Sequence, residues 1–238
     1  MLTARYLNAV AWLAFFAFAP SSEAIQPICT LIAQPWQPLQ NVIESAPPGA
    51  VLCLAAGVWT HGVSLHDKVL TLWGAGPDQT IVMGAGDTDG ISVFGQSLVT
   101  VRGLGIYNFR DGMVVSGQSH VSIRDLQLSN NSRAGLHVLG LADATLENSL
   151  VSYNLDGVAG EESAQVTVQY SQIVSNQRDG IRLDFASLAW LIGNIIQNNE
   201  RYGVRVYSLE NLFVCWRNVV TNNKAGDFYP EMAAYKCW

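Results

Sequence analysis

The sequence predicts an all-β fold: a single-stranded, right-handed parallel β-helix with three short strands and 22–23 residues in each coil. Three observations predict it: a glycine recurs every 22 or 23 residues, alternating apolar residues follow it in most repeats, and an asparagine often stands four residues before it. The six glycines are Gly90, Gly112, Gly135, Gly157, Gly180 and Gly203. Because no such coil buries its own apolar face, the coils must stack into parallel sheets.

Each repeat contains three candidate strands. The first follows the glycine, as in Ile181-Arg182-Leu183, where alternating apolar residues mark a strand with one buried face. A second run begins about ten residues later, as in Val121-Ser122-Ile123, and a third follows it, as in Leu126-Gln127-Leu128. Three short strands joined by tight turns make one triangular coil.

Asparagines support the same repeat. Those four residues before a glycine are Asn108, Asn131, Asn176, Asn199 and Asn222, the last before Gly226. Asparagine tolerates left-handed backbone, and its side-chain amide can hydrogen-bond the coils above and below. We therefore expect a stacked asparagine turn, with an irregular turn where Tyr153 stands at this position and Asn154 follows.

The two ends differ from the repeats. Arg5, an apolar stretch from Ala9 to Ala19 and Ser22-Glu23-Ala24 have the layout of a signal peptide over residues 1–24, with an uncleaved anchor as the alternative. Residues 25–238 form one β-helix domain. We divide it into an N-terminal cap with irregular coils (25–89), regular coils (90–226) and a C-terminal cap (227–238). Helical spacing over Pro38 to Ala46 predicts a short helix that covers the open strand edges of the first coil.

Composition excludes some classes of protein. The net charge is −6 with no basic run, so nucleic acid, which requires clustered Lys and Arg, is not an expected partner. No second apolar run of membrane-spanning length follows the signal peptide, so no membrane partner is expected after cleavage. We expect a secreted or periplasmic monomer.

Four cysteines fit an oxidising compartment. Three pairings exist in principle, but a solenoid holds its ends far apart, which favours Cys29–Cys53 and Cys215–Cys237. A cysteine metal site is the rival, and no two cysteines have metal-ligand spacing with histidines nearby, so no metal site is predicted.

Three segments outside the regular coils carry a further signal: Pro47-Pro48-Gly49-Ala50-Val51-Leu52-Cys53-Leu54, Gly57-Val58-Trp59 and Leu72-Trp73-Gly74-Ala75-Gly76. With these segments and the six glycine-led coils, the chain resembles the pectate-lyase-like superfamily of β-helices, and within it the NosD-type accessory and carbohydrate-binding or sugar-hydrolase repeat proteins. It implies a carbohydrate-directed role, although the architecture hosts lyases, hydrolases, esterases, epimerases, accessory proteins and adhesins.

In polysaccharide-degrading members of the superfamily, the strand after the glycine forms the floor of the cleft. The residues one before, two after and four after each glycine then point outward. On this basis the candidate catalytic residues are Asp156, Asp179, Arg182, Asp184 and Arg205, and the candidate substrate-binding residues are Glu161, His137 and Tyr207.

These residue types suit polysaccharide chemistry. Stacking puts Asp156 about 5 Å from Asp179, where mutual repulsion favours a proton on one carboxyl, as a general acid requires. The stacked pair Arg182 and Arg205 can bind a uronate carboxylate, and Tyr207 can stack on a sugar ring. The alternative is structural: Asp before Gly is ordinary turn chemistry with a left-handed glycine, and the arginines form a surface ion-pair ladder.

Two functions remain after the sequence analysis. One is a secreted protein that binds, or as a lyase or glycoside hydrolase cleaves, an extracellular polysaccharide on the strands after Gly157, Gly180 and Gly203. The other is a non-catalytic surface or periplasmic scaffold that recognises a protein partner. Catalysis is left open, because the double Asp and Gly-His-Gly of polygalacturonases are missing while coil lengths stay uniform. No cofactor is expected, except Ca²⁺ if the protein is a lyase.

Overall fold

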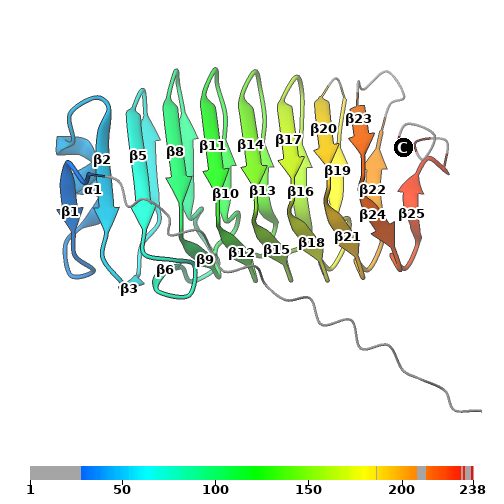
Figure 1. Ribbon diagram of the computed structural model, residues 1–238, viewed down its shortest axis with the longest axis horizontal. Helices are drawn as coiled ribbons and strands as arrows, with labels where there is room; N and C mark the ends of the chain where they lie inside the picture. The colour runs from blue at the N-terminus through cyan, green and yellow to red at the C-terminus, as the bar shows by residue number, and fades with distance from the viewer. Residues whose placement is uncertain (1–27, 186, 208–212, 232, 234–236, 238) are drawn as a thin grey trace, which may run out of the picture.

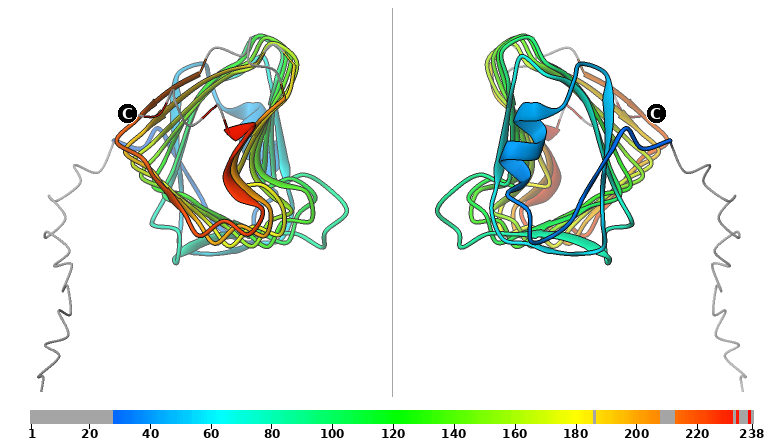
Figure 2. Two further views of the ribbon diagram at one scale, coloured as in Figure 1. Left: turned by 90° about the vertical axis from the view of Figure 1, so that its right-hand side faces the viewer. Right: turned by 90° about the vertical axis from the view of Figure 1, so that its left-hand side faces the viewer.

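The computed structural model describes residues 28–185, 187–207, 213–231, 233 and 237, so the predicted signal peptide lies outside the described residues. It confirms the parallel β-helix, with three parallel sheets as the sides of a triangular rod (Figures 1 and 2). In the part of the chain described, no helix is long and apolar enough to cross a membrane.

The strands of the three sheets follow one another in each coil. Sheet A contains β1 (Leu31–Ala33), β2 (Ala50–Leu54), β5 (Val69–Gly74), β8 (Leu98–Arg102), β11 (His120–Arg124), β14 (Asp143–Glu147), β17 (Gln165–Gln169), β20 (Leu188–Ile192) and β23 (Phe213–Trp216). Sheet B contains β3 (Gly57–Trp59), β6 (Thr80–Met83), β9 (Gly105–Tyr107), β12 (Gln127–Ser129), β15 (Leu150–Ser152), β18 (Gln172–Val174), β21 (Ile195–Gln197) and β24 (Val219–Thr221). Sheet C contains β4 (Val63–His66), β7 (Ile91–Phe94), β10 (Met113–Val115), β13 (Ala134–Val138), β16 (Asp156–Gly160), β19 (Ile181–Leu183), β22 (Tyr202–Val206) and β25 (Gly226–Tyr229).

The core runs along the axis of the rod. In-register pairing stacks each inward side chain on its equivalent in the next coil, as in the column Val158, Ile181 and Val204, all fully buried. A one-residue slip would turn these side chains to the solvent, so burial fixes the register that the glycine spacing predicted.

The N-terminal end of the rod is covered by a short helix. The helix α1 (Leu39–Ser45) buries Leu39 and Ile43 and lies beside β4, as predicted. The Gln40 side chain donates to the Ser64 carbonyl oxygen at 3.0 Å and accepts from the Ser64 N–H at 2.9 Å, in the way a neighbouring strand would. This amide satisfies backbone groups at the otherwise unpaired edge of sheet C.

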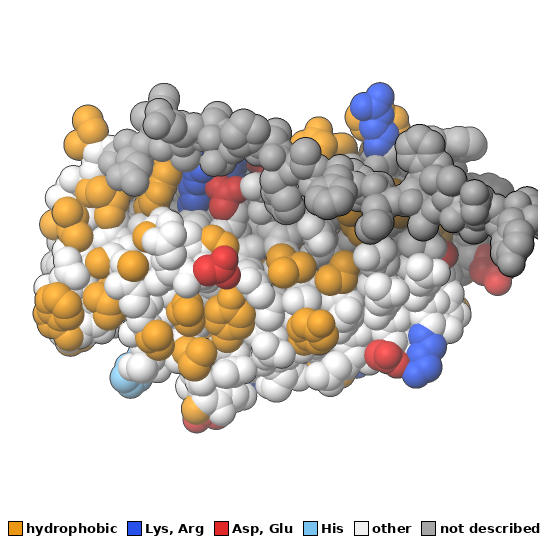
Figure 3. Space-filling view, turned by 60° about the horizontal axis from the view of Figure 1, so that its bottom comes forward, with side chains coloured by type: hydrophobic (Ala, Val, Ile, Leu, Met, Phe, Trp, Pro, Cys, Tyr) orange, Lys and Arg blue, Asp and Glu red, His pale blue; other side chains and the backbone are white. Residues whose placement is uncertain are grey.

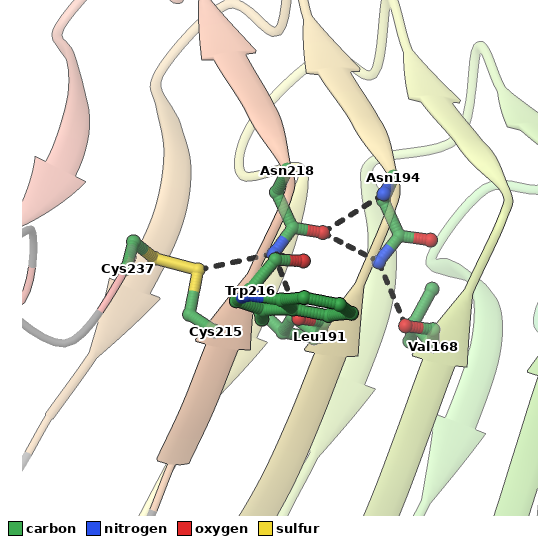
Figure 4. The surroundings of a disulfide bond; sticks show 7 residues. All are labelled: Val168, Leu191, Asn194, Cys215, Trp216, Asn218 and Cys237. Atoms are coloured by element: carbon green, nitrogen blue, oxygen red, sulfur yellow. Dashed lines mark hydrogen bonds between the residues drawn. A yellow bond between two sulfur atoms is a disulfide. The ribbon is translucent and has the colours of Figure 1, made fainter.

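Two disulfides are present, with the predicted pairing. Cys29–Cys53 joins the chain before β1 to β2, and Cys215–Cys237 joins β23 to the C-terminal segment (Figure 4). Beside the second disulfide, the Asn218 side chain donates to the Cys215 sulfur at 3.2 Å and accepts from Asn194 at 2.9 Å (Figure 4). The Cys215–Cys237 disulfide is therefore in contact with a column of hydrogen-bonded amides, Asn194 and Asn218, at the turn between sheets A and B.

The asparagine ladder is real, but its membership differs from the prediction. The buried, mutually hydrogen-bonded amides belong to Asn131, Asn154, Asn176, Asn199 and Asn223. Asn108 and Asn222, assigned to it by spacing, instead occupy the preceding left-handed position, with φ of 58°. Tyr153 shares that left-handed position, so Asn154 is a regular member. This turn differs from that of the previous coil only in length. One residue separates Asn154 from Asp156, whereas two residues separate Asn131 from Ala134, the residue that pairs with Asp156.

The repeating glycine has a different cause from the left-handed turn considered above. Gly157 is not among the left-handed residues, and a Cβ atom there would lie 2.4 Å from the Gly180 carbonyl oxygen and 2.9 Å from the Asn176 amide nitrogen. Gly180 meets Gly203 and Asn199 in the same way. Glycine is required because the next coil and its ladder amide approach too closely for a side chain.

Candidate functional site

The candidate site lies on the outer face of sheet C, over β13, β16, β19 and β22. Pairing aligns Arg182 with Arg205, and the Asp179 N–H donates to the Asp156 carboxylate at 3.2 Å, so the predicted stacking of both pairs is present. The structure brings all eight predicted site residues onto this face. They form one charged network in its middle and an aromatic cluster at its C-terminal end.

Asp156 is the centre of the network. Its carboxylate binds Arg178 through both Nε and Nη2, with the Nε distance at 2.9 Å, and accepts from Arg182 Nε at 2.9 Å. Asp156 is only 2% exposed. The side chain points away from the core, as predicted, but the arginines around it keep it from the solvent.

Arg182 connects three carboxylates. Besides Asp156 it binds Glu161 at 2.6 Å and Asp184 through Nη1. The guanidinium is thereby saturated with acidic partners from two coils, which leaves it little capacity to bind a carboxylate of a ligand. The predicted ion-pair ladder is present, and it is largely buried rather than on the surface.

Asp179 is fully buried one coil further along. Its carboxylate accepts from the Tyr202 N–H at 3.2 Å and lies 3.5 Å from Arg205 and 3.7 Å from Arg201. Burial raises the pKa of the Asp179 carboxyl above its ordinary value; the Tyr202 N–H lowers it, Asp156 raises it further, and the two arginines lower it in part. Burial therefore makes the protonated form of the Asp179 carboxyl more favourable than it is for a free aspartate.

His137 occupies the neighbouring coil and is also buried. Its Nδ1 lies 3.6 Å from Asp111 and its Nε2 lies 3.4 Å from Glu161. Burial acts to raise the pKa of Glu161, but the hydrogen bond from Arg182 and the charges of His137, Arg182 and Arg133 outweigh it, so that pKa is lowered. His137 thus links the network to an earlier coil and does not reach the solvent.

The sequence reasoning missed a second column of arginines. These residues stand two before the glycine, and each reaches back to the aspartate of the previous coil: Arg110 to Asp89, Arg133 to Asp111, Arg178 to Asp156 and Arg201 to Asp179. The repeated Arg-x-Gly was visible in the sequence. In the coil of Gly157 the position two before the glycine is Leu155.

Exposed aromatic rings gather at the C-terminal end of the face. The Arg205 guanidinium lies 4.2 Å from the centre of the Tyr207 ring and 5.6 Å from that of Tyr229. Tyr202 packs 5.0 Å from Tyr229, centre to centre. Tyr207 is 56% and Tyr229 is 45% exposed, so both present ring surface to the solvent beside a positive charge. Among the predicted site residues, Tyr207 is the most accessible.

The carboxylates do not fit a calcium site. A calcium ion needs several oxygens that converge on one point. Asp156, Asp179 and Asp184 each turn toward a guanidinium. In the described part of the chain, no group of three His, Cys, Asp or Glu residues is placed to hold a metal ion.

Comparison with known proteins identifies the family. The model of the right-handed β-helix region matches residues 89–231, more than half of the chain, so the protein belongs to this family. No curated protein matches. Among solved structures, the chain is similar to pectin methylesterase PemA from Erwinia chrysanthemi, with 11% identity, a TM-score of 0.60, and coverage of 88% of this chain and 96% of that one.

Two other structures share the fold. An alginate lyase from Paenibacillus sp. FPU-7 matches with 11% identity and a TM-score of 0.53, over 85% of this chain and 96% of that one. The ORF18 protein of Geobacillus virus E2 matches with 11% identity and a TM-score of 0.58, over 80% of this chain but only 48% of that one. At these identities the likeness concerns the fold alone.

The raised pKa of Asp179 makes a prediction about stability. The fold favours the protonated carboxyl, so this group contributes stability below its unfolded pKa of about 3.9 and loses that contribution as pH rises through the folded value. Asp179→Asn keeps a neutral group at every pH. We expect the melting temperature of the variant to gain on that of the wild type as pH rises from 4 to 8.

Circular dichroism melts at steps of one pH unit measure this difference. Asp87→Asn, at an exposed position, controls for the loss of one charge. A variant that loses ground to the wild type as pH rises would show that ionised Asp179 stabilises the fold.

Proposed function

We propose that this protein binds an extracellular polysaccharide on the outer face of sheet C, at the C-terminal coils, and that binding rather than cleavage is its role there. The observation that carries the proposal is the cluster of exposed Tyr207 and Tyr229 around Arg205. Aromatic rings stack on the apolar faces of sugars, and a neighbouring guanidinium binds hydroxyl or carboxylate oxygens.

The burial of the acidic residues argues for binding. A general acid must come within hydrogen-bond distance of the oxygen that it protonates. Asp156 is 2% exposed and Asp179 is 0% exposed, and each is covered by arginines. Arg205 is paired more loosely than Arg182: its Nε has no hydrogen-bond partner, and its Nη1 lies 3.5 Å from Asp179. Arg201, which is 39% exposed and 3.7 Å from Asp179, lies beside it, so these two arginines of the network have hydrogen-bonding capacity left for a ligand.

The comparisons support the class of ligand only indirectly. PemA is named as a pectin methylesterase and the Paenibacillus protein as an alginate lyase, so both names refer to polysaccharides. A protein of this fold with a short, regular rod and an aromatic end suits a linear glycan laid across the coils. Secretion, which a polysaccharide partner requires, is part of the proposal and agrees with the two disulfides.

Replacement of Tyr207 tests the proposal. We expect the wild-type protein to bind at least one glycan in a panel of pectins, alginates, glucuronans and neutral glycans, measured by calorimetry. We expect Tyr207→Ala to weaken that binding about tenfold, the loss for one stacked aromatic ring of about 1.4 kcal/mol. Trp36→Ala, which removes an exposed aromatic ring near the other end of the rod, is the control.

The same panel separates binding from cleavage. Reducing ends and unsaturated products are followed with and without calcium. No binding to any glycan would refute the proposed function. Cleavage that disappears in Asp179→Asn would replace the binding role with an enzymatic one.

A further inference from the structure

The outward face of sheet B differs from the other two faces in having no charge. None of the residues in its eight strands is Asp, Glu, Lys, Arg or His, although the chain as a whole carries a net charge of −6. Its exposed side chains include Val58, Met83, Gln172, Ile195 and Val219. In Figure 3, which brings the lower side of Figure 1 forward, hydrophobic side chains are spread over this face and charged ones are few.

Two exposed tyrosines border this face in unfavourable backbone conformations. Tyr153 lies at the turn from sheet B to sheet C with φ of 58°, and Tyr170 lies at the turn from sheet A to sheet B with φ of 50°. Most equivalent turns in neighbouring coils have a residue suited to this conformation, such as Asn130 and Asn148. Left-handed backbone is disfavoured for a bulky side chain. The Tyr170 ring lies over Gly193 of the next coil, yet Tyr170 is 61% and Tyr153 is 58% exposed, so most of the surface of both rings is left to be explained by a contact outside the chain.

We propose that sheet B is the interface of a homodimer, in which two copies pack back to back about a two-fold axis that crosses the middle of this face. Sheet B is built as β24-β21-β18-β15-β12-β9-β6-β3, and the tyrosines stand beside β15 and β18, close to that middle. A two-fold axis brings the same coils of both copies together, so the tyrosines at the borders of one copy meet the borders of the middle coils in the other.

Charge and area both point to a second copy as the occupant. Two chains of net charge −6 repel, and the strands of sheet B can meet without placing like charges opposite each other; the acidic residues near this face, Asp78 and Asp125, lie in its flanking turns. Eight strands at a spacing of about 4.8 Å, with a breadth of about 20 Å including the flanking turns, give about 700 Å² per copy. That is close to the roughly 800 Å² per partner of a standard stable interface, in which tyrosine is enriched.

The proposed dimer is independent of the proposed glycan site. Sheets B and C form different sides of the triangular rod, so packing on sheet B leaves the outer face of sheet C open (Figure 2). The dimer would replace the monomer expected from the sequence. It would also present two copies of the sheet C face on one particle, which favours attachment to a polymer that both copies can reach.

The test uses the full chain, exported to an oxidising compartment during expression and purified without reductant. Sedimentation velocity from about 1 to 100 μM measures its mass. We expect twice the mass of the single chain at the upper concentrations. We expect Tyr153→Asn/Tyr170→Asn to raise the dimer dissociation constant at least tenfold. Because asparagine suits both turns, this variant should fold at least as well as the wild type, as its melting temperature will show.

Two further variants keep the result specific. Phe185→Asn makes the same kind of change at a left-handed turn residue that is 75% exposed between sheets C and A, and it should leave the dimer intact. Ile195→Lys puts a charge on sheet B and should dissociate it. A chain that stays monomeric up to 100 μM, or a dimer that survives Ile195→Lys, would overturn the proposal. A monomer that binds a neutral glycan until Ile195→Lys is introduced would assign the face to that glycan instead.

Discussion

Asp156→Ala should lower the stability of the protein by about 3–5 kcal/mol, the usual cost of removing one partner from a buried ion pair. Asp156 accepts hydrogen bonds from Arg178, Arg182 and the Asp179 N–H, and it is buried. Without it, two guanidinium groups and one backbone N–H lose a partner, and the neighbouring carboxylates of Glu161 and Asp184 are already bound to Arg182. For a chain of this size the melting temperature should fall by roughly 10 °C.

Thermal and guanidinium unfolding followed by circular dichroism measure the effect. Asp143→Ala is the matched control, because Asp143 lies 3.5 Å from His120 on the exposed face of sheet A, where such a pair contributes less than about 1 kcal/mol. One coil before Asp156, the equivalent strand position is occupied by Ala134. The Asp156 N–H donates to the carbonyl oxygen of Arg133 in that coil. If Asp156→Ala unfolds at the wild-type temperature, the network is not a stabilising core and its residues are free for a ligand.

Asn176→Ala should cost about 3 kcal/mol, because its side chain serves two other coils at once. It donates to the Val151 carbonyl oxygen at 3.3 Å and to Asn199 at 3.0 Å, and it accepts from the Asn154 backbone at 3.1 Å and from the Asn154 side chain at 3.2 Å. All of these groups are buried, so water cannot take the place of the lost amide.

Asn222→Gly provides the contrast. Spacing in the sequence puts Asn222 in the same ladder, but it is exposed and left-handed, a conformation that glycine adopts freely. We expect a change of only a few tenths of a kcal/mol in the free energy of unfolding. Equal losses in the two variants would mean that the ladder extends to Asn222 after all.

Much of the fold could be predicted because the repeat is visible as a regular spacing of residues along the sequence. A glycine every 22 or 23 residues and alternating apolar runs define coils that must stack, and stacking then leaves one practical pairing for the four cysteines. The capping helix is also local, since its apolar residues lie at helical spacing before Pro47. These features depend on spacing along the chain alone.

The ladder and the site were predicted less completely, because each depends on contacts between coils. Asn154 stands three residues before its glycine rather than four, and only the tertiary structure reveals that a turn shortened by one residue brings it into line with Asn176. The sequence indicated that Asp156 and Asp179 point outward. It did not indicate that Arg178 covers Asp156 and that Arg201 covers Asp179, each arginine coming from the turn of the following coil.

The sequence by itself determined the solenoid, its repeat length, its disulfides and the face on which the charged residues gather. Tertiary structure alone decided which of those residues meet the solvent: it buries Asp156, Asp179 and His137 and leaves Tyr207 exposed. The reason is that the side chains of a strand point alternately to its two faces, with a fixed period of two residues. The exposure of an outward side chain depends instead on the long side chains of the next coil that cover it. The repeating glycine shows the same division, since its position is periodic but its cause is the carbonyl oxygen of the coil that follows.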